Sequence, residues 1–280
     1  MTDKICVVTG ATSGIGKETA KALALEGAFV IIVGRNVKKC IALVKSIKQD
    51  TGNDGVEYVF ADLSVLKQVY KLAAELKQKY HHIDVLVNNA GAYFTTRKLS
   101  KDGYEMNLAL NYLSPYLLTS LLIDILKESS QARIINVSSN AHFKGSIQFG
   151  DLQSKHGFNG FKAYAQSKLA LTLFTYELAR RLKNSSITVN AVPPGLVATK
   201  FGKNNGWFRF YLRRLIKRQE ISATEGSRTC IYLATSPAVV NITGGYFINN
   251  KQVTSSEESY DEKLAKTLWE VTENLTKESI

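Results

Sequence analysis

Tyr164 and Lys168 are the two residues whose types and spacing most directly suggest chemistry. An interval of four residues places both side chains on one face of a helix. A free tyrosine titrates near pH 10, which is too high for efficient proton exchange at neutral pH, and a neighbouring ammonium group lowers that pKa. Such a pair alone is common by chance and is usually an exposed helix face, so it acquires meaning only beside other reactive residues.

The elements that must position this pair follow from the hydrophobic pattern. Short apolar runs alternate with stretches that have apolar residues three and four apart, which is typical of strands alternating with helices. The predicted strands are residues 5–9, 28–33, 56–60, 83–87, 133–137, 187–192 and 246–248. Runs that are apolar on consecutive residues indicate a parallel sheet buried on both faces. We therefore predict an α/β fold of the doubly wound (Rossmann) type, with a mostly parallel sheet and helices on both faces. One domain spans 1–254, and a helical tail spans 255–280.

This topology brings several polar motifs to one edge. The turn Asn88-Asn89-Ala90-Gly91 follows the fourth predicted strand, and Ser139 follows the fifth. The carboxyl ends of parallel strands lie at the same edge of a doubly wound sheet, and ligands bind there. We therefore expect these turns to converge with the glycine-rich turn that follows the first strand.

That glycine-rich turn is Thr9-Gly10-Ala11-Thr12-Ser13-Gly14-Ile15-Gly16, and a helix follows it. Its glycines let the backbone approach a pyrophosphate, and the helix N-terminus offers free N–H groups and the positive end of a dipole. The spacing differs from the common Gly-x-Gly-x-x-Gly fingerprint. The alternative is a tight turn without a ligand.

The end of the second strand indicates which dinucleotide binds. An acidic side chain near this position binds the ribose of NAD, whereas a nearby arginine accommodates the 2′-phosphate of NADP. Gly34 stands where the acid is expected, Arg35 follows, and Lys17 lies beside the glycine-rich turn. We predict NADP(H) over NAD(H). The alternative is that Arg35 and Lys17 are solvated surface cations.

In this arrangement the sequence resembles the short-chain dehydrogenases/reductases, with matching motifs in order over roughly residues 4 to 250. The motifs are the 9–16 turn, Asp62-Leu63, the 88–91 turn, Asn111, Ser139, Tyr164 with Lys168, and Pro194-Gly195. Within that family it looks most like the retinol dehydrogenase-like branch. The segments behind this closer resemblance are 16–20, 111–113, 117–119, 137–142, 147–152, 163–169 and 260–269.

The resemblance implies roles for particular residues. Tyr164 would exchange the proton, Lys168 would lower its pKa and bind the nicotinamide ribose, Ser139 would hold the substrate oxygen, and Asn111 would organise a water. For the cofactor, Asp62 and Leu63 would flank the adenine, and Val197 and Thr199 the carboxamide. Asn88 would contact the adenosine ribose region, and Ala90 and Gly91 would belong to the same cofactor site. They join the residues expected at the cofactor phosphates, which are Gly10, Ser13, Gly14, Ile15, Gly16, Lys17 and Arg35. The implied function is hydride transfer between NADP(H) and a lipophilic aldehyde, ketone or alcohol, and a homodimer follows by the same analogy.

Two features depart from that branch. Pro193 stands where the branch often has His before Pro-Gly. The sequence begins at its first strand, without the N-terminal anchor of many relatives, and no uninterrupted apolar run reaches the length of a membrane span. We expect a cytoplasmic protein that at most touches a membrane surface. Three widely spaced cysteines suggest neither a disulfide framework nor a metal site, and favour a reducing compartment.

The net charge of +12 is largely due to one segment. Residues 200–220 follow Pro194-Gly195 and combine aromatic residues on one side of a helical projection with arginines and lysines on the other. We interpret this segment as a substrate lid with weak affinity for an anionic membrane. The alternative is a packed helix with a solvated basic face. Nucleic-acid binding is not indicated, because no recognisable reading module is present.

Two further alternatives concern function and His142. A catalytically silent dinucleotide-binding regulator is the competing function, and the intact set of Asn111, Ser139, Tyr164 and Lys168 argues against it. The four histidines have no metal-ligand spacing, so we predict no metal site. His142 lies three residues after Ser139 and borders the expected pocket, but we favour a plain structural role for it.

Overall fold

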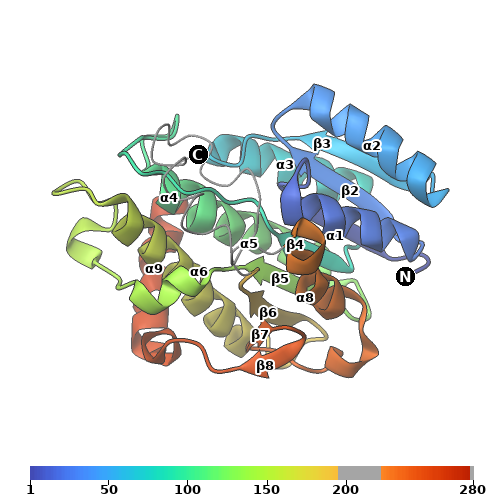
Figure 1. Ribbon diagram of the computed structural model, residues 1–280. Helices are drawn as coiled ribbons and strands as arrows, with labels where there is room; N and C mark the ends of the chain where they lie inside the picture. Colours follow the sequence, from blue (N-terminus) through green and yellow to red (C-terminus); the bar gives the residue numbers. More distant parts are fainter. Residues whose placement is uncertain (195–221, 278–280) are drawn as a thin grey trace.

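A computed structural model describes residues 1–194 and 222–277, and it has an α/β architecture with one eight-stranded sheet (Figure 1). The strand order is β3-β2-β1-β4-β5-β6-β7-β8, and every neighbouring pair is parallel except β7 with β8. The reversal of strand order between β1 and β4 is the switch point of a doubly wound sheet. The predicted fold class is confirmed.

The predicted strands form with small shifts at their ends. The observed strands are β1 (Ile5–Thr9), β2 (Phe29–Gly34), β3 (Val56–Phe60), β4 (Val85–Asn88), β5 (Arg133–Val137), β6 (Thr188–Val192), β7 (Gly245–Ile248) and β8 (Lys251–Val253). Strand β8 was not predicted, because its three residues are all exposed and only Val253 is apolar, which is too short a pattern to indicate a strand. Its turn does have a signal, since Asn249 and Asn250 have φ of 49° and 63°. Two such residues are typical of a two-residue hairpin loop.

Consecutive residues of each central strand enter two different cores, which explains their continuous apolar runs. Val7, Ile31 and Leu86 belong to one cluster, with residues of α3 (Leu66–Lys79), α5 (Ser114–Lys127) and α6 (Gly160–Arg181). Cys6 and Val8 belong to the other, with residues of α1 (Gly14–Leu25), α2 (Val37–Thr51) and α8 (Ala223–Thr235). Helices therefore cover both faces of the sheet, as Figure 1 shows. The short elements are α4 (Met106–Leu108), η1 (Ala109–Leu113), η2 (Asn140–Lys144), η3 (Phe149–Asp151), η4 (Pro237–Val239) and η5 (Glu257–Tyr260).

The C-terminal helix α9 (Glu262–Lys277) packs against α6 (Figure 1). Trp269 contacts Tyr116 and Phe174, with ring centroids 5.1 Å and 5.7 Å apart, and the guanidinium of Arg181 lies 4.1 Å from its ring. Ala265 and Leu268 of α9 lie in the same core cluster as α5 and α6. The tail thus completes the apolar core of the domain.

The segments α4, η1 and α5 form one continuous helix, residues Met106–Lys127. It is long and apolar enough to cross a membrane by composition, but 67% of its most apolar window is buried inside the protein. Such burial is what a core helix requires. The turn η1 within it is a π-helix, and such turns occur frequently at functional sites.

Candidate active site

The glycine-rich turn between β1 and α1 lies directly against the 88–91 turn. Gly10 has φ of 64°, and a Cβ at this position would lie 2.8 Å from the Ala90 Cα. Thr9 joins the two turns, because its Oγ1 accepts hydrogen bonds of 3.0 Å from the backbone N–H groups of Asn89 and Ala90. The Asn89 amide donates back to the Thr9 carbonyl at 2.8 Å. The two turns therefore form one rigid unit at the carboxyl edge of the sheet.

The start of α1 can receive an anion. Ser13 is the N-cap residue, and its side chain accepts no hydrogen bond from the helix. The first turn contains no acidic residue, so nothing opposes the positive end of the helix dipole. Gly14 has φ of 59°, and a Cβ at Gly16 would collide with the Asn89 amide. A backbone cradle of this kind fits the pyrophosphate of a dinucleotide.

The end of β2 excludes a side chain at position 34. A Cβ on Gly34 would lie 2.7 Å from the Cys40 Sγ and 2.8 Å from the Thr12 Cγ2. The expected absence of an acidic side chain is therefore enforced by packing, since α2 places Cys40 in that space. Arg35 follows and is exposed, and Lys17 of α1 is half-buried.

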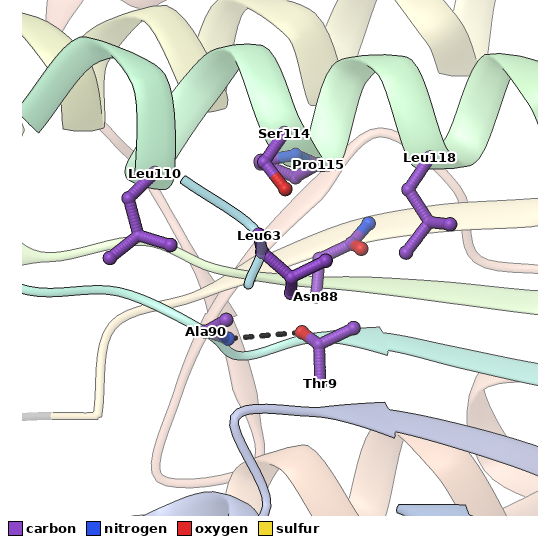
Figure 2. A pocket seen from close by; sticks show the side chains of 8 residues that line it. All are labelled: Thr9, Leu63, Asn88, Ala90, Leu110, Ser114, Pro115 and Leu118. Atoms are coloured by element: carbon purple, nitrogen blue, oxygen red, sulfur yellow. Dashed lines mark hydrogen bonds between the residues drawn. The ribbon is translucent and has the colours of Figure 1, made fainter. Parts of the chain in front are cut away.

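Asp62 and Leu63 begin the connection from β3 to α3. The Asp62 carboxylate accepts hydrogen bonds from the Ser64 backbone at 3.1 Å and the Ser64 hydroxyl at 2.7 Å, which orders this loop. Figure 2 shows Leu63 beside Asn88 and beneath the first turn of α5. The residues around this narrow cavity are Thr9, Leu63, Asn88, Ala90, Leu110, Ser114, Pro115 and Leu118.

The Asn88 side chain is engaged in the fold. Its Nδ2 donates to the Thr119 hydroxyl at 3.0 Å and to the Asn136 Oδ1 at 2.8 Å. Asn136 in turn donates to Thr175 at 2.9 Å, so a buried polar chain links β4, β5, α5 and α6. The Asn88 Oδ1 has no hydrogen-bond partner among the described residues. A contact with the cofactor would have to use this oxygen or the backbone.

Ser139, Tyr164 and Lys168 meet beyond the end of β5. Ser139 is the N-cap of η2, and its Oγ accepts a hydrogen bond from the Ala141 backbone at 3.2 Å. Tyr164 on α6 is hydrogen-bonded to the Ser139 side chain and is 7% exposed. One turn further along α6, the Lys168 Nζ lies 5.9 Å from the Tyr164 ring centre and donates to the Val137 carbonyl at 2.8 Å.

Burial is the main influence on the pKa values of Tyr164 and Lys168. It raises the pKa of Tyr164 to about 12, while the hydrogen bond with Ser139 acts in the opposite direction. Burial also lowers the pKa of Lys168 to about 7, because the ammonium loses its hydration. The lowered tyrosine pKa expected from a neighbouring ammonium is therefore not found here. The lysine is itself desolvated and directs its nitrogen to a backbone carbonyl.

Asn111 lies in the π-helical turn η1 and faces the 88–91 turn. Its Oδ1 accepts from the Ala92 backbone at 2.9 Å, and its Nδ2 donates to the Ala92 carbonyl at 3.0 Å and to Ser167 at 3.1 Å. Both amide hydrogens are thus used within the protein. A Cβ on Gly91 would lie 3.1 Å from the Asn111 Oδ1 and 3.4 Å from the Lys168 Nζ, which shows how closely these groups surround the turn.

The structure thus brings together Asn111, Ser139, Tyr164 and Lys168. Val197, Thr199 and the predicted lid 200–220 lie outside the described residues. Sequence reasoning missed Tyr93, whose ring centre lies 5.3 Å from that of Tyr164. Its position two residues after Gly91 was the available signal, since residues that follow this turn remain near the sheet edge.

Comparison with known proteins identifies the family. The family model for short chain dehydrogenases matches residues 4–207. Human polyprenol dehydrogenase is 40% identical over 274 residues, which cover 95% of this chain and 83% of that protein. Human retinol dehydrogenase 13 is 40% identical over 278 residues, covering 95% and 82% of the two chains. The protein belongs to the short-chain dehydrogenase/reductase family and resembles its retinol dehydrogenase-like branch.

Solved structures agree with this assignment. A crystal structure of an uncharacterised protein from Mycobacterium paratuberculosis has a TM-score of 0.80 and 31% identity, covering 99% of this chain and 94% of the other. The NADP active-site complex of RhlG from Pseudomonas aeruginosa has a TM-score of 0.72 and 25% identity, covering 92% and 97%. The protein is therefore an oxidoreductase of a family that uses a nicotinamide dinucleotide and acts on alcohol or carbonyl groups.

Proposed function

We propose that this protein is an NADP(H)-dependent oxidoreductase that transfers hydride between the nicotinamide and a lipophilic aldehyde, ketone or alcohol. The observation that carries the proposal is the convergence of Ser139, Tyr164 and Lys168 beside the backbone cradle of Gly10 and Gly14. When bound, the dinucleotide supplies or accepts the hydride, and the protein binds and orients it.

The residues around the substrate oxygen divide the work. Ser139 donates a hydrogen bond to that oxygen, because its Oγ keeps its hydroxyl hydrogen while it accepts one bond from the Ala141 backbone. Tyr164 gives the proton during reduction and takes it during oxidation. Lys168 stabilises the tyrosinate when the amine is charged. Asn111 positions the end of the 88–91 turn through its two hydrogen bonds with the backbone of Ala92.

The preference for NADP(H) is supported by the end of β2. Gly34 admits no side chain, so an acidic partner for a free 2′-hydroxyl cannot stand there. The exposed Arg35 guanidinium suits a 2′-phosphate, because it presents several N–H donors and always remains charged. Asp62 and Leu63 would flank the adenine at the neighbouring strand end.

The substrate class is supported by the names of two relatives, polyprenol dehydrogenase and retinol dehydrogenase, since polyprenol and retinol are lipophilic alcohols. A lipophilic substrate partitions into membranes, so we place the protein in the cytoplasm with peripheral contact at a membrane surface. The net charge of +12 favours an anionic surface.

The test is NADPH oxidation with carbonyl compounds graded by chain length and polarity, repeated with NADH. We expect kcat/KM to rise with substrate chain length and to be higher with NADPH. Arg35→Ala should raise the KM for NADPH about tenfold and leave that for NADH nearly unchanged. Tyr164→Phe should lower kcat by about 10²–10⁴-fold while the protein still binds NADPH. A higher kcat/KM with NADH, or turnover that survives Tyr164→Phe, would contradict the proposal.

A further inference from the structure

His142 is buried directly behind the candidate catalytic serine. It is 0% exposed, and its ring centre lies 4.2 Å from that of Phe143 and 4.9 Å from that of Tyr246. Its Nδ1 lies 2.8 Å from the Ser139 carbonyl oxygen. On the other side of the ring, the Ser256 backbone N–H donates to Nε2 at 3.1 Å. Both ring nitrogens therefore have backbone partners from different parts of the chain.

These contacts determine the tautomer. Because Nε2 accepts a hydrogen from Ser256, it carries none, and the ring proton of a neutral histidine must then lie on Nδ1. From there it is donated to the Ser139 carbonyl, which also accepts from the His142 backbone at 3.1 Å. The Tyr246 hydroxyl, 3.3 Å from Nδ1, donates toward Asn140 and leaves this bond intact.

The hydrogen bonds of His142 also affect the orientation of the Ser139 hydroxyl. Two hydrogen bonds to its carbonyl fix the backbone of Ser139, and the Ala141 N–H occupies a lone pair of its Oγ. The Oγ then keeps its hydroxyl hydrogen and one lone pair for Tyr164 and the substrate oxygen. The far side of the ring is anchored because Ser255, beside Ser256, bonds Tyr176 of α6 at 2.6 Å.

We propose that His142, as the neutral Nδ1–H tautomer, is a positioning residue for catalysis that holds the Ser139 backbone and ties it to the segment Ser255–Tyr260. This inference builds on the proposed function of Ser139. It assigns His142 more than the structural role favoured from the sequence. Protonation of Nε2 would place two donors against each other at Ser256 and break that contact.

The surroundings make this protonation unfavourable at neutral pH. Burial lowers the pKa of His142, and the bond to the Ser139 carbonyl only partly offsets this. Of the described residues, none forms an ion pair with it. Titratable groups on the elements packed around it include Tyr164, Lys168 and Tyr176 of α6, Tyr246 of β7, Glu257, Glu258 and Tyr260 of η5, and Lys144 of η2 itself.

Three substitutions separate the two bonds. The amide of His142→Asn can still donate to the Ser139 carbonyl but does not reach Ser256. The longer His142→Gln reaches Ser256 but not Ser139, and His142→Phe keeps only the ring. We expect kcat near wild type for Asn and about tenfold or more lower for Gln and Phe. KM and the Kd for NADPH should stay within about threefold. All three variants lose at least one buried hydrogen bond and should have a lower Tm than the wild type. A loss of stability alone therefore does not predict that kcat is higher for Asn than for Gln and Phe. His156→Gln, at an exposed histidine, is the matched control.

The pH profile and the tautomer give independent readouts. Burial lowers the pKa of His142, so the kcat for carbonyl reduction should fall in the wild type only as the pH drops below the ordinary histidine range, and it should not fall in His142→Asn. Imidazole ¹⁵N shifts at pH 7.5 should report hydrogen on Nδ1, whether or not a substrate is known. A hydrogen on Nε2, or equal kcat for the Asn, Gln and Phe variants, overturns the inference. A wild type that reduces no carbonyl but shows the expected tautomer contradicts the proposed function and leaves the positioning of Ser139 standing.

Discussion

Replacing Lys168 by methionine should stabilise the protein at neutral pH and abolish its activity. Lys168 is 3% exposed, and burial lowers the pKa of its amine from 10.5 to about 7. Since each pKa unit corresponds to about 1.36 kcal/mol, the buried lysine costs roughly 5 kcal/mol of folding stability at pH 7. Methionine is similar in length and carries no charge. It leaves the Val137 carbonyl without the 2.8 Å bond from Nζ, which costs about 1–3 kcal/mol.

The net gain at pH 7 is therefore about 2–4 kcal/mol, or ~5–10 °C in Tm. The sign of the stability difference between Lys168→Met and the wild type reverses as the pH rises. Between the folded pKa of about 7 and the unfolded value of 10.5, the unfolded chain binds a proton that the folded protein does not. The stability of the wild type thus rises with pH relative to the variant, by up to about 1.36 kcal/mol per pH unit, until the cost has vanished. Above pH 10 the wild type should be the more stable of the two, because it keeps the bond to Val137.

The assay is thermal unfolding of both proteins from pH 6 to 10.5, followed by circular dichroism. Lys162→Met is the matched control, because Lys162 lies on the same helix and is exposed. It should follow the wild type at every pH. If Lys168→Met melts below the wild type at pH 7, and the difference does not change with pH, the buried amine is not destabilising and the reasoning is refuted.

Two further substitutions test the packing around the site. Gly34→Ala should cost about 1–3 kcal/mol and weaken NADPH binding, because its Cβ would meet Cys40 and Thr12; adding Cys40→Ala should recover part of the loss in Tm. Gly150→Ala, where nothing lies within 4 Å, is its control, and equal Tm values for the two alanine variants would disprove the clash. Trp269→Ala should cost about 2–4 kcal/mol by removing the contacts of α9 with Tyr116 and Phe174. The exposed Lys266→Ala on the same helix should be nearly neutral in urea unfolding, and a Trp269 variant equally stable would show that α9 is dispensable.

The residue pattern was enough to predict the architecture of the sheet and its helices. Continuous apolar runs such as Val30 to Val33 are buried on both faces of a parallel sheet, and their lengths predicted seven of the strands within two residues. Because parallel strands end at one edge, the order of motifs along the chain was enough to predict that the glycine-rich turn, the 88–91 turn and Ser139 converge. These are properties of local pattern and topology, which a linear sequence records directly. The family resemblance added Asn111, Tyr164 and Lys168 to this site.

The pKa values, packing and tautomers of these residues depend on how the chain folds around them. Burial reverses the expected direction for the Tyr164 pKa and partly neutralises Lys168. Cys40 makes Gly34 obligatory, and Ser256 sets the tautomer of His142. Each effect comes from desolvation or from a partner distant along the chain. The cost of removing a charge from water and the contact between two atoms depend on the packed neighbours, which residue spacing does not specify.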